Sequence, residues 1–156
     1  MIAPSIKTKG ILFLCLSVLW MGFIFYMSSQ TAEVSGADSG AIVKFIENVV
    51  PSFKSSGVAL YLETIVRKCA HFFEYSVLGF LVFGFFNYNS VSPKAKILFS
   101  ALVCTVYAVS DEVHQIFVEG RACRAYDVLI DFFGSVVGIF AFLMLTYIAA
   151  KRQKSR

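Results

Sequence analysis

The chain has 156 residues, of which 58% are hydrophobic and 16% aromatic, and its formal net charge is +4. These values, with a mean hydropathy of +0.73, are typical of an integral membrane protein and exclude a soluble globular domain of this size. The modest positive charge predicts no nucleic-acid partner, because the distribution of basic residues around the membrane accounts for it.

Four apolar segments predict transmembrane helices, because each is close to the length of about 20 residues that crosses hydrocarbon. They cover about residues 11–29, 69–87, 97–117 and 128–150, with a long outer loop over 30–67. The first segment follows Lys7 and Lys9 as a signal peptide would, but its apolar run is long and no A-x-A-like cleavage site follows promptly. We therefore expect residues 1–156 to form one all-α domain, a membrane bundle of four helices.

Basic and acidic residues fall on opposite sides of these spans. Eight basic residues precede the first span, follow the last or lie between the second and third: Lys7, Lys9, Lys94, Lys96, Lys151, Arg152, Lys154 and Arg156. All ten acidic residues lie in or beside the first and third connections: Glu33, Asp38, Glu47, Glu63, Glu74, Asp111, Glu112, Glu119, Asp127 and Asp131. Because cytoplasmic loops are enriched in Lys and Arg, both termini are predicted to be cytoplasmic.

The first outer connection contains two predicted local structures. Residues 31–40, TAEVSGADSG, have the small polar composition of a mobile loop. Beyond Asp38 and Ser39, which can cap a helix, apolar residues recur at helical spacing until Pro51 and predict a short amphipathic helix over 38–50 on the outer surface. A second apolar patch, residues 58–66, continues with helical period into the second span, either as a lid or as an approach through the interface.

Ionisable side chains enter the second span at its outer end. On a helix, Lys68, His71 and Tyr75 share one face, which Gly79 extends, while Glu74 lies at the neighbouring edge. A hydrogen-bonded histidine at the interface is the ordinary explanation for a single His. Several ionisable groups beside a span that could consist of leucine favour a functional role.

The third span ends in a second polar block. Asp111, His114 and Gln115 face one way on a helix, and Glu112 lies about 100° around it. The short connection that follows contains Gly120, Arg121 and Arg124. Its glycine permits a sharp turn or a close backbone approach to a ligand.

The fourth span begins with two aspartates. Asp127 and Asp131 share a helical face with Gly134, Ser135 and Gly138. Two small residues four positions apart are typical of close contact between transmembrane helices. The combination indicates that this face looks into the bundle.

The four cysteines predict no special chemistry. Cys69 and Cys123 fall on the outer side, where a disulfide could form, but their spacing does not specify one and we expect none. Cys15 and Cys104 lie inside spans and are interpreted as packing residues. Because there is no C-x-x-C pair, the cysteines do not indicate a zinc site.

The polar residues at the outer ends of the last three spans predict a shared pocket. A charged group in or beside a bilayer costs about 2.5–3.5 kcal/mol on insertion scales, so such residues face a bundle interior or a wet cavity. The predicted ligand-binding residues are Lys68, His71, Glu74, Tyr75, Asp111, Glu112, His114, Gln115, Arg121, Arg124, Asp127 and Asp131.

Four motifs together resemble the VanZ-like family of small bacterial membrane proteins. They are S-S-Q at 28–30, K-x-x-H-F-x-E-Y at 68–75, S-D-E-x-H-Q-x-F-x-x-G-R at 110–121, and D-x-x-x-D-x-x-G-x-x-x-G at 127–138. The match extends from about Trp20 to Gly138, and D-E-x-H-Q is its most specific part. Glu119 stands where the family often has proline. The resemblance implies a multi-pass protein of the bacterial plasma membrane, and the family's named member is associated with resistance to the glycopeptide teicoplanin.

The first functional interpretation is a binding pocket. Lys68, Arg121 and Arg124 would hold the phosphate of an anionic lipid-linked or cell-wall ligand, since arginine makes bidentate contacts and lysine supplies a point charge. The partners would be membrane lipids and a lipid-linked cell-wall precursor or a glycopeptide.

Two alternatives remain open. An outer-leaflet enzyme would use His71, Glu74, Asp111, Glu112 and His114 for acid/base or metal chemistry on a lipid or cell-wall precursor, with Asp127 and Asp131 as further oxygen ligands. Neither H-x-x-E nor D-E-x-H is a strong metal signature, and no cofactor is specified. In a purely structural interpretation, the polar groups pair with one another and lock the helices together.

Overall fold

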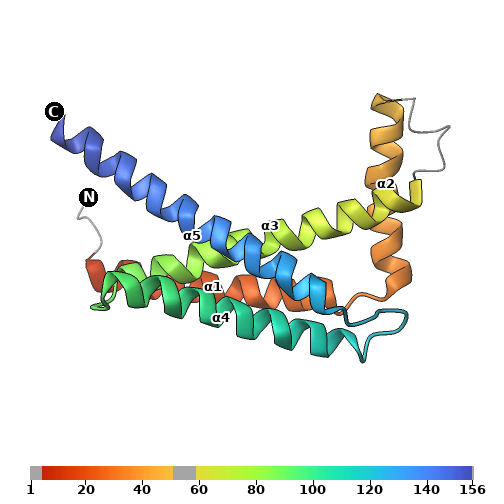
Figure 1. Cartoon of the computed structure of the whole chain (residues 1–156), viewed down its shortest axis with the longest axis horizontal. Coiled ribbons are helices and arrows are strands. Elements are labelled where there is room, and N and C mark those ends of the chain that lie inside the picture. Colours follow the sequence, from red (N-terminus) through yellow and green to blue (C-terminus); the bar gives the residue numbers. More distant parts are fainter. Residues whose placement is uncertain (1–4, 51–58, 156) are drawn as a thin grey trace.

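The computed structural model describes residues 5–50 and 59–155, and these form helices joined by short connections, with no strand among them. The five helices are α1 (Ile6–Ser28), α2 (Ala32–Val49), α3 (Ala59–Asn87), α4 (Pro93–Gln115) and α5 (Ala125–Lys154) (Figure 1). All except α2 are long and apolar enough to cross a membrane. The predicted all-α bundle with four membrane spans is therefore confirmed.

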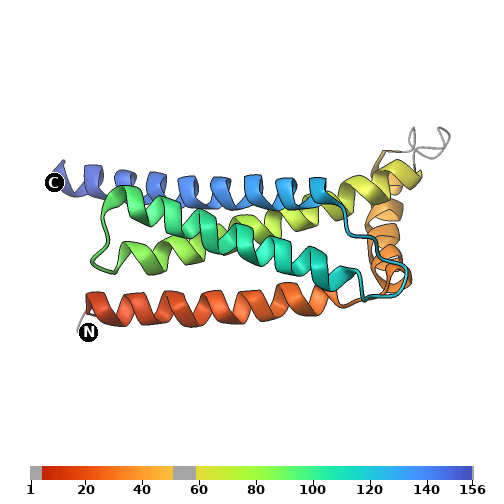
Figure 2. The same ribbon diagram turned by 60° about the horizontal axis from the view of Figure 1, so that its bottom comes forward.

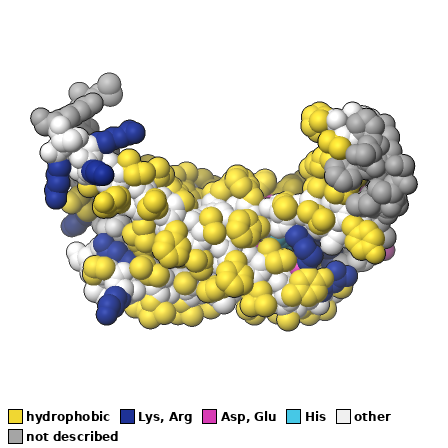
Figure 3. All heavy atoms as spheres, turned by 45° about the horizontal axis from the view of Figure 1, so that its top comes forward, with side chains coloured by type: hydrophobic (Ala, Val, Ile, Leu, Met, Phe, Trp, Pro, Cys, Tyr) yellow, Lys and Arg dark blue, Asp and Glu magenta, His cyan; other side chains and the backbone are white. Residues whose placement is uncertain are grey.

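The four long helices run along the bundle, and the two termini lie at the same end of it (Figures 1 and 2). Helix α2 and the connection between α4 and α5 lie at the opposite end, where α2 runs across the bundle direction (Figure 1). Hydrophobic side chains cover the length of the bundle, while Lys and Arg gather near its ends (Figure 3). This is the surface expected of a protein that spans a membrane.

Helices α1, α2 and α4 begin with a side-chain cap. Ser5, Thr31 and Ser92 each accept a hydrogen bond from the backbone N–H three residues later, which satisfies one free donor of the first turn. All four spanning helices begin before the predicted spans, α3 by ten residues, and α5 also ends four residues later than predicted. Hydropathy identifies only the part of a helix that suits hydrocarbon, whereas the helix itself continues into the interface.

Residues 32–41 are helical, so the predicted mobile loop there was wrong. Helix α2 begins at Ala32, because Thr31 caps it and the Ala32 N–H also donates to the carbonyl of Glu119, 3.1 Å away. Ser39 and Val43 are buried. The predicted amphipathic helix thus exists and starts earlier than Asp38; Pro51 and Val58, which belonged to the predictions for this connection, lie outside the described residues.

Helices α3 and α5 cross with their backbones in contact. A Cβ atom on Gly138 would lie 1.8 Å from the carbonyl oxygen of Ser76, and one on Gly134 would lie 2.4 Å from that of Phe72. On α3, a Cβ atom on Gly79 would lie 2.2 Å from the carbonyl oxygen of Ser135. Gly134, Ser135 and Gly138 are all buried, which confirms that this face of α5 looks inward.

Helix α1 is attached through two long side chains. The indole N–H of Trp20 donates to the carbonyl of Glu74 at 2.8 Å, and the Tyr107 hydroxyl donates to the carbonyl of Met21 at 2.5 Å. Around these contacts Ile24 packs with Tyr75 in the buried core. The C-terminal half of α1, which leads to S-S-Q, is therefore held against α3 and α4.

Replacement of Gly138 by alanine should push α3 and α5 apart. We expect the free energy of unfolding to fall by about 1–3 kcal/mol, the usual cost of overpacking, since the new methyl group meets backbone that cannot rotate away. Unfolding in detergent would measure it. Gly22→Ala is the control, because nothing lies within 4 Å of a Cβ there; its effect should stay within about 0.5 kcal/mol. Equal stability of the two variants would contradict the close crossing.

The basic end of the bundle is predicted to face the cytoplasm. A green fluorescent protein fused after Arg156 should fluoresce, and alkaline phosphatase fused there should be inactive, because that enzyme needs the oxidising side of the membrane. Phosphatase fused after Gln30, at the other end of α1, should be active. The reverse pattern would invert the orientation.

Candidate functional site

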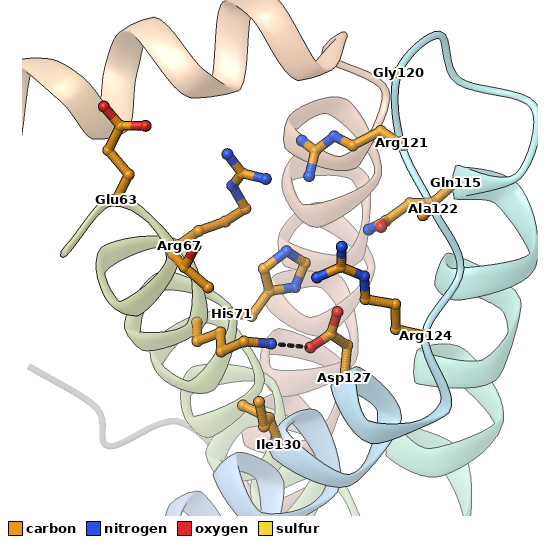
Figure 4. A pocket seen from close by; sticks show the side chains of 12 residues that line it. Glu63, Arg67, His71, Gln115, Gly120, Arg121, Ala122, Arg124, Asp127 and Ile130 are labelled. Atoms are coloured by element: carbon orange, nitrogen blue, oxygen red, sulfur yellow. Dashed lines mark hydrogen bonds and ion pairs between the residues drawn. The ribbon is translucent and has the colours of Figure 1, made fainter. Parts of the chain in front are cut away.

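A pocket of about 250 Å³ opens at the end of the bundle opposite the termini (Figure 4). It lies between the first turns of α3, the start of α5 and the connection from α4 to α5. Its lining residues are Glu63, Thr64, Arg67, Lys68, His71, Gln115, Gly120, Arg121, Ala122, Arg124, Asp127 and Ile130. The lining includes four Lys or Arg side chains and only two carboxylates, so the pocket has an excess of positive charge.

Lys68 is neutralised within the protein. Its ammonium lies 2.5 Å from Oδ1 of Asp127 and 4.0 Å above the centre of the Tyr126 ring. Arg124 contacts the same tyrosine and donates from Nη1 to its hydroxyl at 2.7 Å. Lys68, Asp127, Tyr126 and Arg124 form one connected rim on the α5 side of the pocket.

Arg67 and Arg121 are not neutralised. Among the residues that the structure describes, neither forms an ion pair, and Nε of Arg67 is buried without a hydrogen-bond partner. Arg121 donates from Nε to the carbonyl of Gln30 at 3.1 Å, which fixes its direction. Burial lowers the pKa of Arg121, and the positive charge of Arg67 lowers it further. Two guanidinium groups therefore repel each other across the pocket.

A smaller pocket of about 140 Å³ adjoins the first. The two share Arg67, His71 and Arg121. Residues of α2, including Asp38 and Ser39, line one side of the smaller pocket, so α2 covers it from outside, and Glu74 lines the side on α3. Arg67, Arg121 and His71 therefore lie at the boundary between the two pockets.

Beneath the pocket lies a layer of buried acids. Asp131 is fully buried, neither of its oxygens forms a hydrogen bond, and its Oδ1 lies 3.7 Å from Nδ1 of His71. Tyr75 is also fully buried with its hydroxyl unpartnered. Asp111, Asp131 and Glu74 all act electrostatically on Tyr75, so these groups occupy one region of the interior.

Asp111, Glu112 and Gln115 connect α4 to its surroundings. The Gln115 amide donates to Oγ of Ser28 at 3.0 Å and to Oδ2 of Asp111 at 3.3 Å, which joins α4 to the end of α1. Oε2 of Glu112 accepts from the backbone N–H of Arg124 at 2.8 Å and so holds the start of α5. Glu112 therefore points toward the connection and braces it from below.

His114 does not reach the pocket. Its ring stacks on Phe25 of α1 with centroids 4.5 Å apart, and its Nε2 lies 3.1 Å from Oγ of Ser29. The structure therefore separates His114 from His71 and from the cationic lining. Of the other predicted residues, Lys68, His71, Gln115, Arg121, Arg124 and Asp127 line the larger pocket, Glu74 lines the smaller one, and Tyr75, Asp111, Glu112 and Asp131 are buried.

Arg67 is the important residue absent from the prediction. It lines both pockets, whereas the predicted face of the second span began at Lys68. A signal was present, because Glu63, Arg67 and His71 recur every four residues and so lie along one helical face.

The geometry weighs against two interpretations. No group of three or more His, Cys, Asp or Glu within residues 5–50 and 59–155 is arranged to hold a metal ion, so metal catalysis gains no support from the carboxylates. Complete internal pairing also fails, because buried polar atoms of Arg67, Tyr75, Asp111, Glu112 and Asp131 lack hydrogen-bond partners. Polar groups placed only to lock helices together would satisfy one another.

A family model described as VanZ/LLP1 matches residues 13–146, which include all four spans except their ends and every residue of both pockets. No curated protein and no solved structure matches the chain.

Proposed function

Because the chain belongs to the VanZ/LLP1 family of multi-pass membrane proteins, we propose that the polar pocket is this protein's working site and binds a phosphate-bearing ligand of the bacterial cell envelope. A lipid-linked or other cell-wall precursor has this chemistry. The protein acts as a receptor for the anion at the outer end of its bundle.

The observation that carries the proposal is the unpaired state of Arg67 and Arg121 on a common pocket. Two guanidinium groups held close together without a carboxylate cost electrostatic free energy, which an anion between them removes. Guanidinium groups match phosphate well, because each can give two parallel N–H donors. The carbonyl of Gln30 aims Arg121, so part of the binding geometry exists before the ligand arrives.

The rest of the lining supports the same ligand. Arg124 adds positive charge at the rim, where it donates to the Tyr126 hydroxyl, and Asp127 holds the paired Lys68 beside it. Gln115 and Gly120 also border the pocket. Gly120 has a φ of 73°, a backbone conformation that glycine adopts without steric cost.

An enzyme remains the alternative proposal, with weaker support. His71 with Asp131 is the imidazole and carboxylate pair that borders the pocket, but their 3.7 Å separation is too long for a hydrogen bond. His114, the second candidate base, lies against Phe25 outside both pockets. Binding therefore fits the geometry better than acid/base catalysis.

Replacement of either unpaired arginine should weaken anion binding. We expect Arg67→Ala and Arg121→Ala each to reduce the affinity of the detergent-purified protein for phosphatidylglycerol by about tenfold or more, since a charge-assisted hydrogen bond contributes about 1.5–3 kcal/mol. Arg121→Lys should bind with intermediate affinity, because lysine keeps the positive charge but cannot give two parallel N–H donors to the phosphate. Native mass spectrometry would measure the bound lipid.

Arg152→Ala is the matched control, since it removes an exposed arginine at the other end of the bundle. It should leave binding unchanged, and zwitterionic phosphatidylcholine should bind all variants equally weakly. Undiminished phosphatidylglycerol binding by both alanine variants would remove the basis of the proposal.

We also propose that the pocket contributes to reduced susceptibility to teicoplanin, as the association of the family's named member suggests. Expression of the wild-type chain in a susceptible bacterium should raise the minimum inhibitory concentration of teicoplanin. The double variant Arg67→Ala, Arg121→Ala should not raise it, although immunoblotting of membranes shows equal amounts of protein. An equal rise with both proteins would separate the phenotype from the pocket.

A further inference from the structure

An open apolar groove lies beside the cationic pocket on the side of the bundle. It has a volume of about 390 Å³ and lies between α3 and α5, lined by Ile65, Lys68, Cys69, Phe72 and Ile130. Lys68 and Ile130 also line the cationic pocket, so the two hollows meet at these side chains. Apart from Lys68, no lining side chain of the groove is charged.

The groove results from the way the two helices cross. Their backbones touch where Phe72 faces Gly134 and Ser76 faces Gly138. From this crossing, α3 and α5 separate toward the end of the bundle that carries α2 (Figure 1). Side chains alone fill the widening gap, and Ile65 and Cys69 remain exposed along it.

The depth of the groove follows from exposed aromatic residues. Tyr26, Tyr61 and Tyr126 lie near the outer ends of α1, α3 and α5 and are 45–72% exposed. Tyrosine is enriched at the boundary between headgroups and hydrocarbon, so these residues indicate that boundary. Arg67 and Phe72 lie six and eleven positions beyond Tyr61 on α3, about 9 Å and 16 Å along the helix axis. The inner end of the groove therefore lies deeper than Arg67, by about 7 Å along the helix.

We propose that the ligand is a membrane lipid whose phosphate lies between Arg67 and Arg121 while one of its hydrocarbon chains runs through the groove between α3 and α5. This inference rests on the proposed anion-binding function and specifies its source, a lipid and not a free phosphate. The lipid enters sideways from the outer leaflet, because the groove is open to the membrane along its length.

Lys68 lies where the headgroup and the chain of such a lipid would part. Its ammonium is held at the rim by Asp127 and Tyr126, while its apolar stem lines the groove. A chain that moves from bilayer to groove gains no hydrophobic transfer energy, since lipid tails are as apolar as the lining. The groove therefore acts through shape, by giving the chain a path that keeps the phosphate at headgroup depth.

Blocking the groove tests this path. Cys69→Trp places an indole in the groove, since the exposed Cys69 lines the groove and not the cationic pocket. Phe73→Trp is the control, because Phe73 on the same helix is 64% exposed and lines neither hollow. We expect Cys69→Trp to weaken phosphatidylglycerol binding by about tenfold, equivalent to about 1.4 kcal/mol, and Phe73→Trp to leave it unchanged. Both variants are first compared with wild type by gel filtration and thermal unfolding.

A second measurement locates the acyl chain directly. Phosphatidylglycerol that carries a photoactivatable diazirine in one acyl chain should label wild-type peptides containing Cys69, Phe72 and Ile130, and Arg121→Ala should abolish the labelling. Labelling spread evenly around the bundle would overturn the groove, as would soluble glycerol phosphate that binds as tightly as the lipid.

The two proposals fail in different ways. If Arg67→Ala and Arg121→Ala lose the lipid while Cys69→Trp retains it, the pocket stands and the groove is wrong. If both alanine variants retain the lipid, the anion-binding function itself is wrong, and the groove proposal falls with it.

Discussion

The backbone contact between α3 and α5 determines how the rest of the protein is arranged. Gly79, Gly134 and Gly138 let the two helices meet without side chains between them. Helices that touch at one level and cross must separate on either side of it. At the end of the bundle that carries α2, that separation creates the space that Lys68 and Asp127 bridge and that the cationic pocket and the apolar groove occupy. Small residues in the membrane interior thus set the size of a site several turns away.

Charges at the site are arranged in two layers. Arg67, Arg121 and Arg124 surround the pocket, and Asp111, Glu112 and Asp131 are buried beneath it. The layers interact at a distance, because Arg121 feels the charge of Asp111 and of Glu112 without forming an ion pair with either. The acids therefore make it less costly to hold cations beside hydrocarbon, while leaving their N–H donors free for a ligand.

The sequence allowed the spans, their polar ends and the inward face of α5 to be predicted, because hydropathy and helical spacing are properties of single helices. The position of His114 could not be predicted, because its neighbour depends on how α1 packs against α4. In the structure its ring stacks on Phe25 of α1. The residue at which α2 begins could not be predicted either. Its first N–H donates to Glu119, a residue far along the chain, so composition alone favoured a loop.

Most carboxylates at the site hold parts of the protein together, whereas the arginines line the pocket, and this arrangement favours a receptor over a catalyst. Glu112 accepts the Arg124 N–H, Asp111 accepts the Gln115 amide, and Asp127 holds Lys68. Each of these carboxylates already has a structural partner, whereas general acid/base catalysis needs a group that can reach the substrate and exchange a proton with it. His71 and Glu74 also line the pockets, but Nδ1 of His71 lies 3.7 Å from the Asp131 carboxylate, too far for a hydrogen bond that would orient the imidazole as a base. The guanidinium groups that line the larger pocket stay protonated and so cannot relay protons. They can bind and orient an anion, and the groove beside them provides room for the rest of an amphiphilic molecule.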